Sequence, residues 1–144
     1  MKKSSILVII LCLLFQFSYS QPTNETIQAG AYYYSPNVLE IEVGSTVTWL
    51  NVGGLHDVNF NINSITSESF NNPESLLDES GVALLPAVYA QNADNPVEIG
   101  SYTFMTPGTY NYDCSVGLHA EQGMVGQIIV TYVAYPGCTD NDPT

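Results

Sequence analysis

Alternating apolar and polar residues restrict this chain to a β-sheet architecture. In residues 39–43, 47–49, 102–104 and 110–114, every second side chain is large and apolar. A period of two matches the side chains on one face of a β-strand, so each stretch predicts a half-buried antiparallel strand. Gly44-Ser45 and Thr106-Pro107-Gly108 predict tight turns, and the Ile- and Val-rich residues 126–132 predict a last strand. The pattern indicates an all-β fold, a two-sheet Greek-key β-sandwich of about seven to eight strands.

Residues 61–99 interrupt the alternation. Asn and Ser dominate the beginning of this segment, and Pro73 precedes a short run that is compatible with a helical turn. Gly81 and Pro86 limit any such helix to a couple of turns. We therefore expect an irregular, partly helical excursion that lies across the sandwich, because segments of this length without strands are usually specific to one protein or functional.

The two ends of the chain differ from the middle. Lys2 and Lys3 precede an apolar run at residues 6–17, and the small residues Ser18 and Ser20 suit cleavage before Gln21. Residues 1–20 are therefore predicted to be a cleaved signal peptide, which implies an exported protein, periplasmic or secreted. Residues 21–133 would form one domain, expected to be monomeric and without a membrane span. Residues 134–144 read as a linker or the start of a further C-terminal region, in which Cys138 would find a partner beyond Thr144.

The charge of the mature chain is entirely acidic. Lys2 and Lys3 are the only basic residues, against 14 acidic ones, so cleavage of the signal peptide removes every Lys and Arg. Nucleic-acid binding requires basic side chains near phosphates and is excluded. An acidic surface instead favours a partner with a basic docking surface.

A set of potential metal ligands lies near the C-terminal end. Cys114, His119 and Met124 are each separated by four residues, and His56 is the only other histidine. Two imidazoles and a thiolate in one plane, with a weak axial thioether, are typical of a blue-copper electron-transfer site. Both histidines belong to this set, so the chain can build one mononuclear copper centre and no second, catalytic one. We therefore expect a protein that is not an enzyme.

The sequence around these residues resembles the cupredoxins, the plastocyanin and azurin superfamily of small type 1 copper proteins. The resemblance covers residues 36–44, 47–51, 56–58, 102–104, 107–114 and 123–126. It implies that His56, Cys114, His119 and Met124 bind copper, with each histidine using a ring nitrogen. The spacing of the ligand loop is similar to that of phytocyanin-like variants. Many cupredoxins have Asn after the first histidine, where this chain has Asp57. The extra negative charge predicts a lower reduction potential.

The resemblance implies transfer of single electrons between redox protein partners by Cu(II)/Cu(I) cycling. His119 would be the electron exit, and Leu55, Val116 and Leu118 would form an apolar docking patch around it. An alternative is copper sequestration or delivery by a domain of a larger secreted protein, without electron transfer. A structural or adhesive domain is a third reading, against which the complete ligand set argues.

Overall fold

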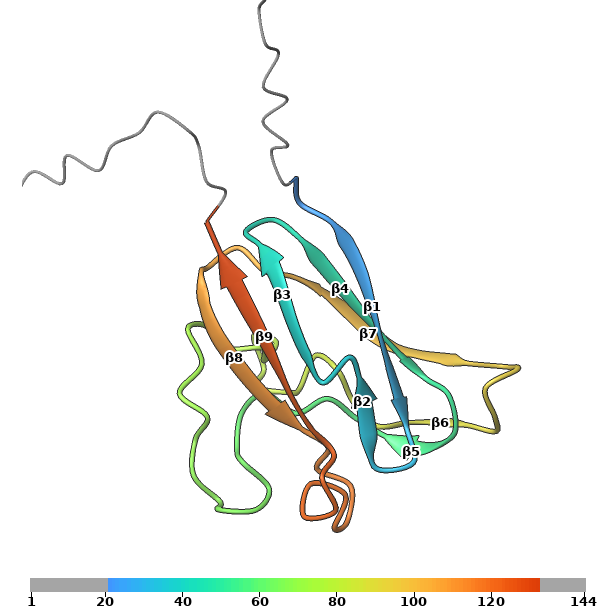
Figure 1. The fold of residues 1–144 in the computed structure, drawn as a ribbon. Coiled ribbons are helices and arrows are strands. Elements are labelled where there is room, and N and C mark those ends of the chain that lie inside the picture. Colours follow the sequence, from blue (N-terminus) through green and yellow to red (C-terminus); the bar gives the residue numbers. More distant parts are fainter. Residues whose placement is uncertain (1–20, 133–144) are drawn as a thin grey trace, which may run out of the picture.

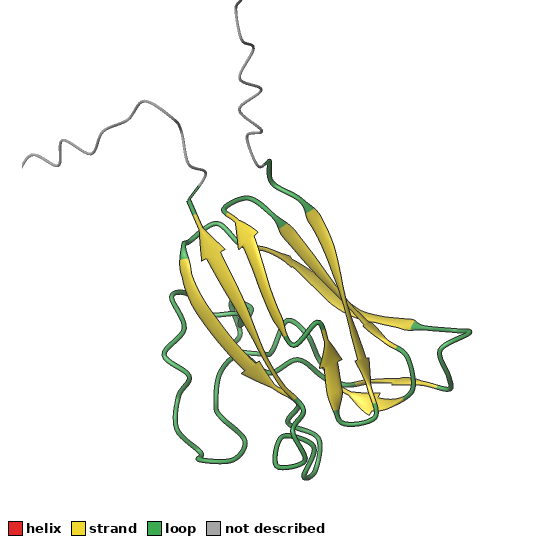
Figure 2. Ribbon diagram, in the orientation of Figure 1, coloured by secondary structure: helices red, strands yellow, loops and turns green. Residues whose placement is uncertain are grey.

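The described part of the chain, residues 21–132 of the computed structural model, folds into strands and loops without a helix (Figure 1, Figure 2). Nine strands occur in this range. They are β1 (Asn24–Gly30), β2 (Tyr33–Ser35), β3 (Val38–Glu42), β4 (Thr46–Asn51), β5 (Gly54–His56), β6 (Val88–Ala90), β7 (Val97–Thr103), β8 (Gly108–Asp113) and β9 (Val125–Thr131). The all-β, two-sheet prediction is confirmed. The strand number exceeds the expected seven to eight because β2, β5 and β6 have three residues each, too few to show a period of two.

The strands form two main sheets and a small ribbon. One sheet has the order β2-β1-β4-β7, the other β3-β9-β8, and β5 pairs with β6. Two pairs, β1 with β4 and β3 with β9, are parallel. The prediction that the strands around Gly44-Ser45 form an antiparallel pair is therefore wrong. Gly44, with φ of +92°, turns the chain from one sheet to the other. Alternation shows which face of a strand is buried and does not show which strand lies beside it.

An aromatic cluster fills the space between the sheets. Trp49 packs edge-on against Phe60, Phe104 and Tyr112, with ring centroids 5.7, 6.4 and 5.8 Å away. All four side chains are buried, and each contributes roughly 1.5–3 kcal/mol of burial free energy. Because Tyr112 lies in β8 two residues before Cys114, this core also fixes the end of the strand that carries the cysteine.

The segment between β5 and β6 covers the open edge of β8 (Figure 1). The side chain of Asn72 bonds both the N–H and the C=O of Asn111, each at 2.8 Å, as a neighbouring strand would. Nearer the end of β8, the buried Asp113 carboxylate accepts hydrogen bonds from Asn59 Nδ2, Ser64 N and Ser64 Oγ at 2.6 to 2.9 Å. Residues 57–87 are irregular as predicted, and they protect a sheet edge. The expected bounds of 61–99 are wrong at their C-terminal end, because this range also contains β6 and the beginning of β7.

The expected helical turn in this excursion is absent from the described residues. Leu76 is buried, and Leu77 forms an isolated β-bridge with Ala83. The carboxylate of Glu74 accepts a hydrogen bond from the Tyr110 hydroxyl at 2.9 Å. These contacts with the sandwich and within the loop replace the local hydrogen bonds of a helix. Tertiary packing therefore outweighs the preference of the residues after Pro73 for a helical turn.

The signal peptide at residues 1–20, the region 134–144 and Cys138 lie outside the described residues, and their assignment stays a prediction. Within residues 21–132, the structure contains no helix with the length and hydropathy needed to cross a membrane.

Candidate metal centre

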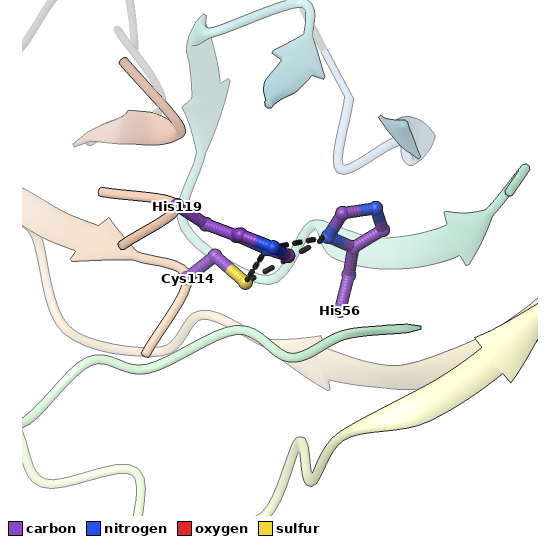
Figure 3. A group of neighbouring side chains, drawn as sticks. All are labelled: His56, Cys114 and His119. Atoms are coloured by element: carbon purple, nitrogen blue, oxygen red, sulfur yellow. Dashed lines mark hydrogen bonds between the residues drawn. The ribbon is translucent and has the colours of Figure 1, made fainter. Parts of the chain in front are cut away.

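The side chains of His56, Cys114 and His119 converge at one end of the sandwich (Figure 3). Nδ1 of His56 lies 3.2 Å from Nδ1 of His119, and the Cys114 sulfur lies 3.8 and 3.3 Å from these two nitrogens. His56 and Cys114 are buried and His119 is half-buried. The structure thus brings together three of the four residues that the sequence selects, although His56 and Cys114 are 58 positions apart in the chain.

Two of the three residues lie at strand ends and the third lies in a short loop. His56 is the last residue of β5, Cys114 directly follows β8, and His119 lies in the loop between β8 and β9. Backbone bonds close this loop, from Cys114 N to Met124 O at 3.1 Å and from Met124 N to His119 O at 3.0 Å. A strand-borne histidine and a short closed loop therefore face each other, as the sequence predicts.

Met124 is fully buried at the end of the same loop. Its backbone bonds to Cys114 and His119 place it beside the three converging residues. The position suits an axial thioether, and coordination by its sulfur remains a prediction.

The three donor atoms fit a transition-metal ion. The point equidistant from these three atoms lies about 2.0 Å from each. This distance matches a metal–imidazole bond and is about 0.3 Å shorter than a metal–thiolate bond. A thiolate with two imidazoles is a donor set that suits copper. Among residues 21–132 this cluster consists of a thiol and two imidazoles, two of the three residues being buried, rather than of exposed carboxylates.

A backbone carbonyl on the far side of the His56 ring fixes the orientation of this ring. Its Nε2 donates to the carbonyl oxygen of Gly53 at 2.9 Å, which leaves Nδ1 directed toward Cys114 and His119. Burial, followed by the nearby His119, lowers the pKa of His56, while the hydrogen bond to Gly53 acts in the opposite direction. A neutral imidazole held by a backbone carbonyl is the usual form of a metal-binding histidine.

Burial raises the pKa of the Cys114 thiol to about 11 in the metal-free protein. The backbone N–H groups of Asp57 and Val116 act in the opposite direction, because they stabilise negative charge on sulfur. Since the thiolate is the metal-binding form, a metal ion bound by Cys114 would displace the proton of this thiol to solvent.

A carboxylate clasp joins the two ligand-bearing segments. Asp57, next to His56, accepts a hydrogen bond from Ser115 N at 2.7 Å and a second, short one from the Ser115 hydroxyl. Tyr34 supports the same segment, because its hydroxyl donates to the Asp57 carbonyl at 2.5 Å. Sequence reasoning identified Asp57 as unusual but missed Ser115 and Tyr34. The position of Ser115 directly after the cysteine was the available signal; nothing in the sequence indicates Tyr34.

An uncharged groove opens beside the centre. A shallow groove reaches both histidines between the β1–β2 turn, the Val52–Leu55 region and the residues after β6. Its lining includes Leu55 and Val116, and Leu118 is 60% exposed next to His119. These positions agree with the predicted apolar patch. No Asp or Glu lines the groove.

Comparisons with known proteins also indicate a copper-binding protein. Residues 22–131 match the model of the family described as copper binding proteins of the plastocyanin/azurin family. A plastocyanin from Scenedesmus fuscus is 35% identical over 103 residues, which are 71% of this chain and 90% of that protein. A chloroplastic plastocyanin from Oryza sativa subsp. indica is 29% identical over 70% of this chain and 56% of its own length.

Solved structures of similar proteins include a reduced amicyanin mutant and an auracyanin from Roseiflexus castenholzii. The amicyanin is 22% identical with a TM-score of 0.48, over 75% of this chain and 82% of its own. The auracyanin is 20% identical with a TM-score of 0.47, over 78% of this chain and 98% of its own.

Proposed function

The chain belongs to the plastocyanin/azurin family of copper-binding proteins, and we propose that it is a type 1 copper protein that carries single electrons between redox partners. In this proposal His56, Cys114 and His119 would bind the ion through Nδ1, Sγ and Nδ1, and Met124 would contribute its thioether. When bound, copper supplies the Cu(II)/Cu(I) couple.

The observation that carries the proposal is the placement of mutually close donor atoms on a rigid framework. Cys114 follows a strand whose aromatic neighbours are buried, and His56 is fixed by the Gly53 carbonyl. Ligands held in this way change little between two oxidation states, which favours fast electron transfer. The same rigidity is less suited to a carrier that must release its metal. Sequestration or delivery is therefore the weaker alternative.

His119 is the proposed site of electron exchange. It is half-buried, whereas His56 and Cys114 are buried. The uncharged groove and Leu118 surround it, so a partner that docks there meets an apolar surface. Small, transient interfaces are typical of redox encounters.

The partner is proposed to be a redox protein with a basic docking surface. Beyond residue 20 the chain has 14 acidic residues and no Lys or Arg. No acidic residue of the described part of the chain lines the groove, so acidic side chains elsewhere would attract a basic partner from a distance while apolar contacts form at the centre. The proposed location is the periplasm or the cell exterior, based on the signal-peptide pattern in residues 1–20.

Electron exchange with a basic partner is expected to fall with salt. We expect the rate between the copper-loaded protein and a basic cytochrome c, followed by haem absorbance, to decrease at least tenfold between about 0.01 and 1 M salt. The reason is that the Debye length shrinks from about 30 to about 3 Å over this range. Reduction by a neutral hydroquinone serves as the control and should change little.

A copper-loaded protein that exchanges no electron with either reagent, but gives up its copper readily to a chelator, would contradict the proposal and favour copper delivery. A rate of electron exchange that rises with salt would contradict the proposal of a basic partner, and it would leave the electron-transfer function standing.

Replacing Asp57 with Asn is expected to raise the reduction potential. The amide can still accept the Ser115 N–H bond, so the clasp persists while a negative charge near the sulfur is removed. One charge at this range contributes roughly 1 kcal/mol, which corresponds to about 40 mV for a one-electron couple. Cyclic voltammetry of the two proteins measures the difference. An unchanged or lower potential in the variant would refute this role of Asp57.

A further inference from the structure

Tyr32 has a backbone conformation that is unfavourable for its residue type. It is the second residue of the two-residue turn between β1 and β2, and its φ is +62°. Turn positions of this kind usually take Gly or Asn, because a Cβ atom is crowded in the left-handed region. A bulky residue there is an outlier, and such outliers accumulate at functional sites. The turn alone therefore does not account for a tyrosine.

The ring of Tyr32 lies against His119. The two ring centroids are 5.0 Å apart and the ring planes are at 78°, an edge-to-face contact. Such contacts are attractive and prefer one relative orientation. Tyr32 is 44% exposed, so burial of apolar area gives little reason for a large ring at this position. The contact with His119 is the specific interaction that the strained residue makes.

His119 lacks the support that fixes His56. The ring of His56 is buried and bonded to the Gly53 carbonyl. The ring of His119 lies in a loop at the surface, and its hydrogen-bond contacts in residues 21–132 are with His56 and Cys114 themselves. Tyr32 does not belong to the three converging residues, but its ring makes an edge-to-face contact with the His119 ring.

We propose that Tyr32 is a positioning residue for His119. Its ring restricts rotation of the imidazole and keeps Nδ1 directed at Cys114 and His56, the role that the Gly53 carbonyl has for His56. Gly or Asn in place of Tyr32 would relieve the strain of the turn but would leave the His119 ring without lateral support. The proposal deepens the proposed copper function and rests on it, but it makes a statement about the metal-free protein as well.

The first test uses the metal-free protein, where copper plays no part. Relaxation of the ¹³C-labelled His119 ring is compared in wild type, Tyr32→Gly and Tyr32→Phe. Tyr32→Gly is expected to show a ring that exchanges between orientations, and Tyr32→Phe is expected to match wild type because the aromatic ring is retained. Tyr33→Ala is the matched control: it removes the other exposed tyrosine of the same hairpin, whose ring lies over Gly30.

The second test uses the copper-loaded proteins. Loss of Cu(I) to a strong chelator is expected to be about tenfold faster in Tyr32→Gly than in wild type, the low end of the effect of removing a residue that orients a ligand. Tyr32→Phe and Tyr33→Ala should lose copper at the wild-type rate.

The urea concentration at the midpoint of unfolding distinguishes positioning of His119 from simple stabilisation of the turn. If Tyr32→Gly unfolds at lower urea while the His119 ring stays ordered and copper loss is unchanged, Tyr32 serves the turn and the proposal is overturned. Mobility of His119 in Tyr32→Phe equal to that in Tyr32→Gly would also overturn it. If none of the proteins binds copper, the proposed function fails, and the metal-free relaxation still decides the role of Tyr32.

Discussion

Serine in place of Cys114 is expected to abolish the intense thiolate-to-copper absorption of the Cu(II)-loaded protein. The hydroxyl is a hard donor that keeps its proton, so the soft ligand of the three-atom cluster is lost. We expect copper affinity to fall by more than about 100-fold, beyond the typical effect of changing a residue that only orients a ligand. Visible absorption and electron paramagnetic resonance of copper-titrated protein measure the loss.

The fold should persist in this variant. Cys114 is buried, and serine replaces it with little change in volume, so near-native circular dichroism is expected. Cys138→Ser is the matched control, because it removes the other cysteine of the mature chain and should leave the absorption intact. An intense band that survives in Cys114→Ser would contradict the assignment of Cys114 as the thiolate ligand. Loss of the band in Cys138→Ser would indicate that Cys138 supplies the thiolate instead.

The parts of the molecule that the sequence predicts are those with a local signal. The strands around Ile41, Trp49 and Tyr112 follow from a period of two, because one face of each is buried. The convergence of His56 with the Cys114–Met124 loop could be anticipated because copper chemistry needs these donor types and the chain offers few others.

The remaining features depend on contacts between distant residues. The parallel pairing of β3 with β9 involves Ile41 and Val130, 89 positions apart, and nothing in either strand specifies the partner. The excursion lacks its expected helix because bonds such as those from Asn72 to Asn111 decide its path. Tyr32 was missed for the opposite reason: a tyrosine gives no sequence signal of a left-handed conformation, so its role emerges only from the backbone angle and the ring contact.

Alanine in place of Gly126 is expected to destabilise the protein by about 3 kcal/mol, the upper part of the usual cost of overpacking. Gly126 in β9 lies opposite Tyr112 in β8, and an ideal Cβ atom at this position would overlap the tyrosine ring. The ring has no room to move, because Tyr112 is 1% exposed and packs against Tyr34 and Phe60 at centroid distances of 4.9 Å each. Urea denaturation of the metal-free protein measures the cost.

Gly30→Ala provides the matched control. Gly30 in β1 also lies opposite a tyrosine, Tyr33 in β2, whose ring occupies the space of the missing Cβ atom. Tyr33 is 40% exposed, so its ring can swing into solvent, and we expect a loss of less than about 1 kcal/mol. Equal losses in the two variants would contradict the explanation, because the overlap is similar and only the freedom of the tyrosine differs. Tyr112 lies in β8 two residues before Cys114, which directly follows this strand, so Gly126→Ala should also weaken copper binding. An effect on stability alone would show that the strand end is held independently of the aromatic core.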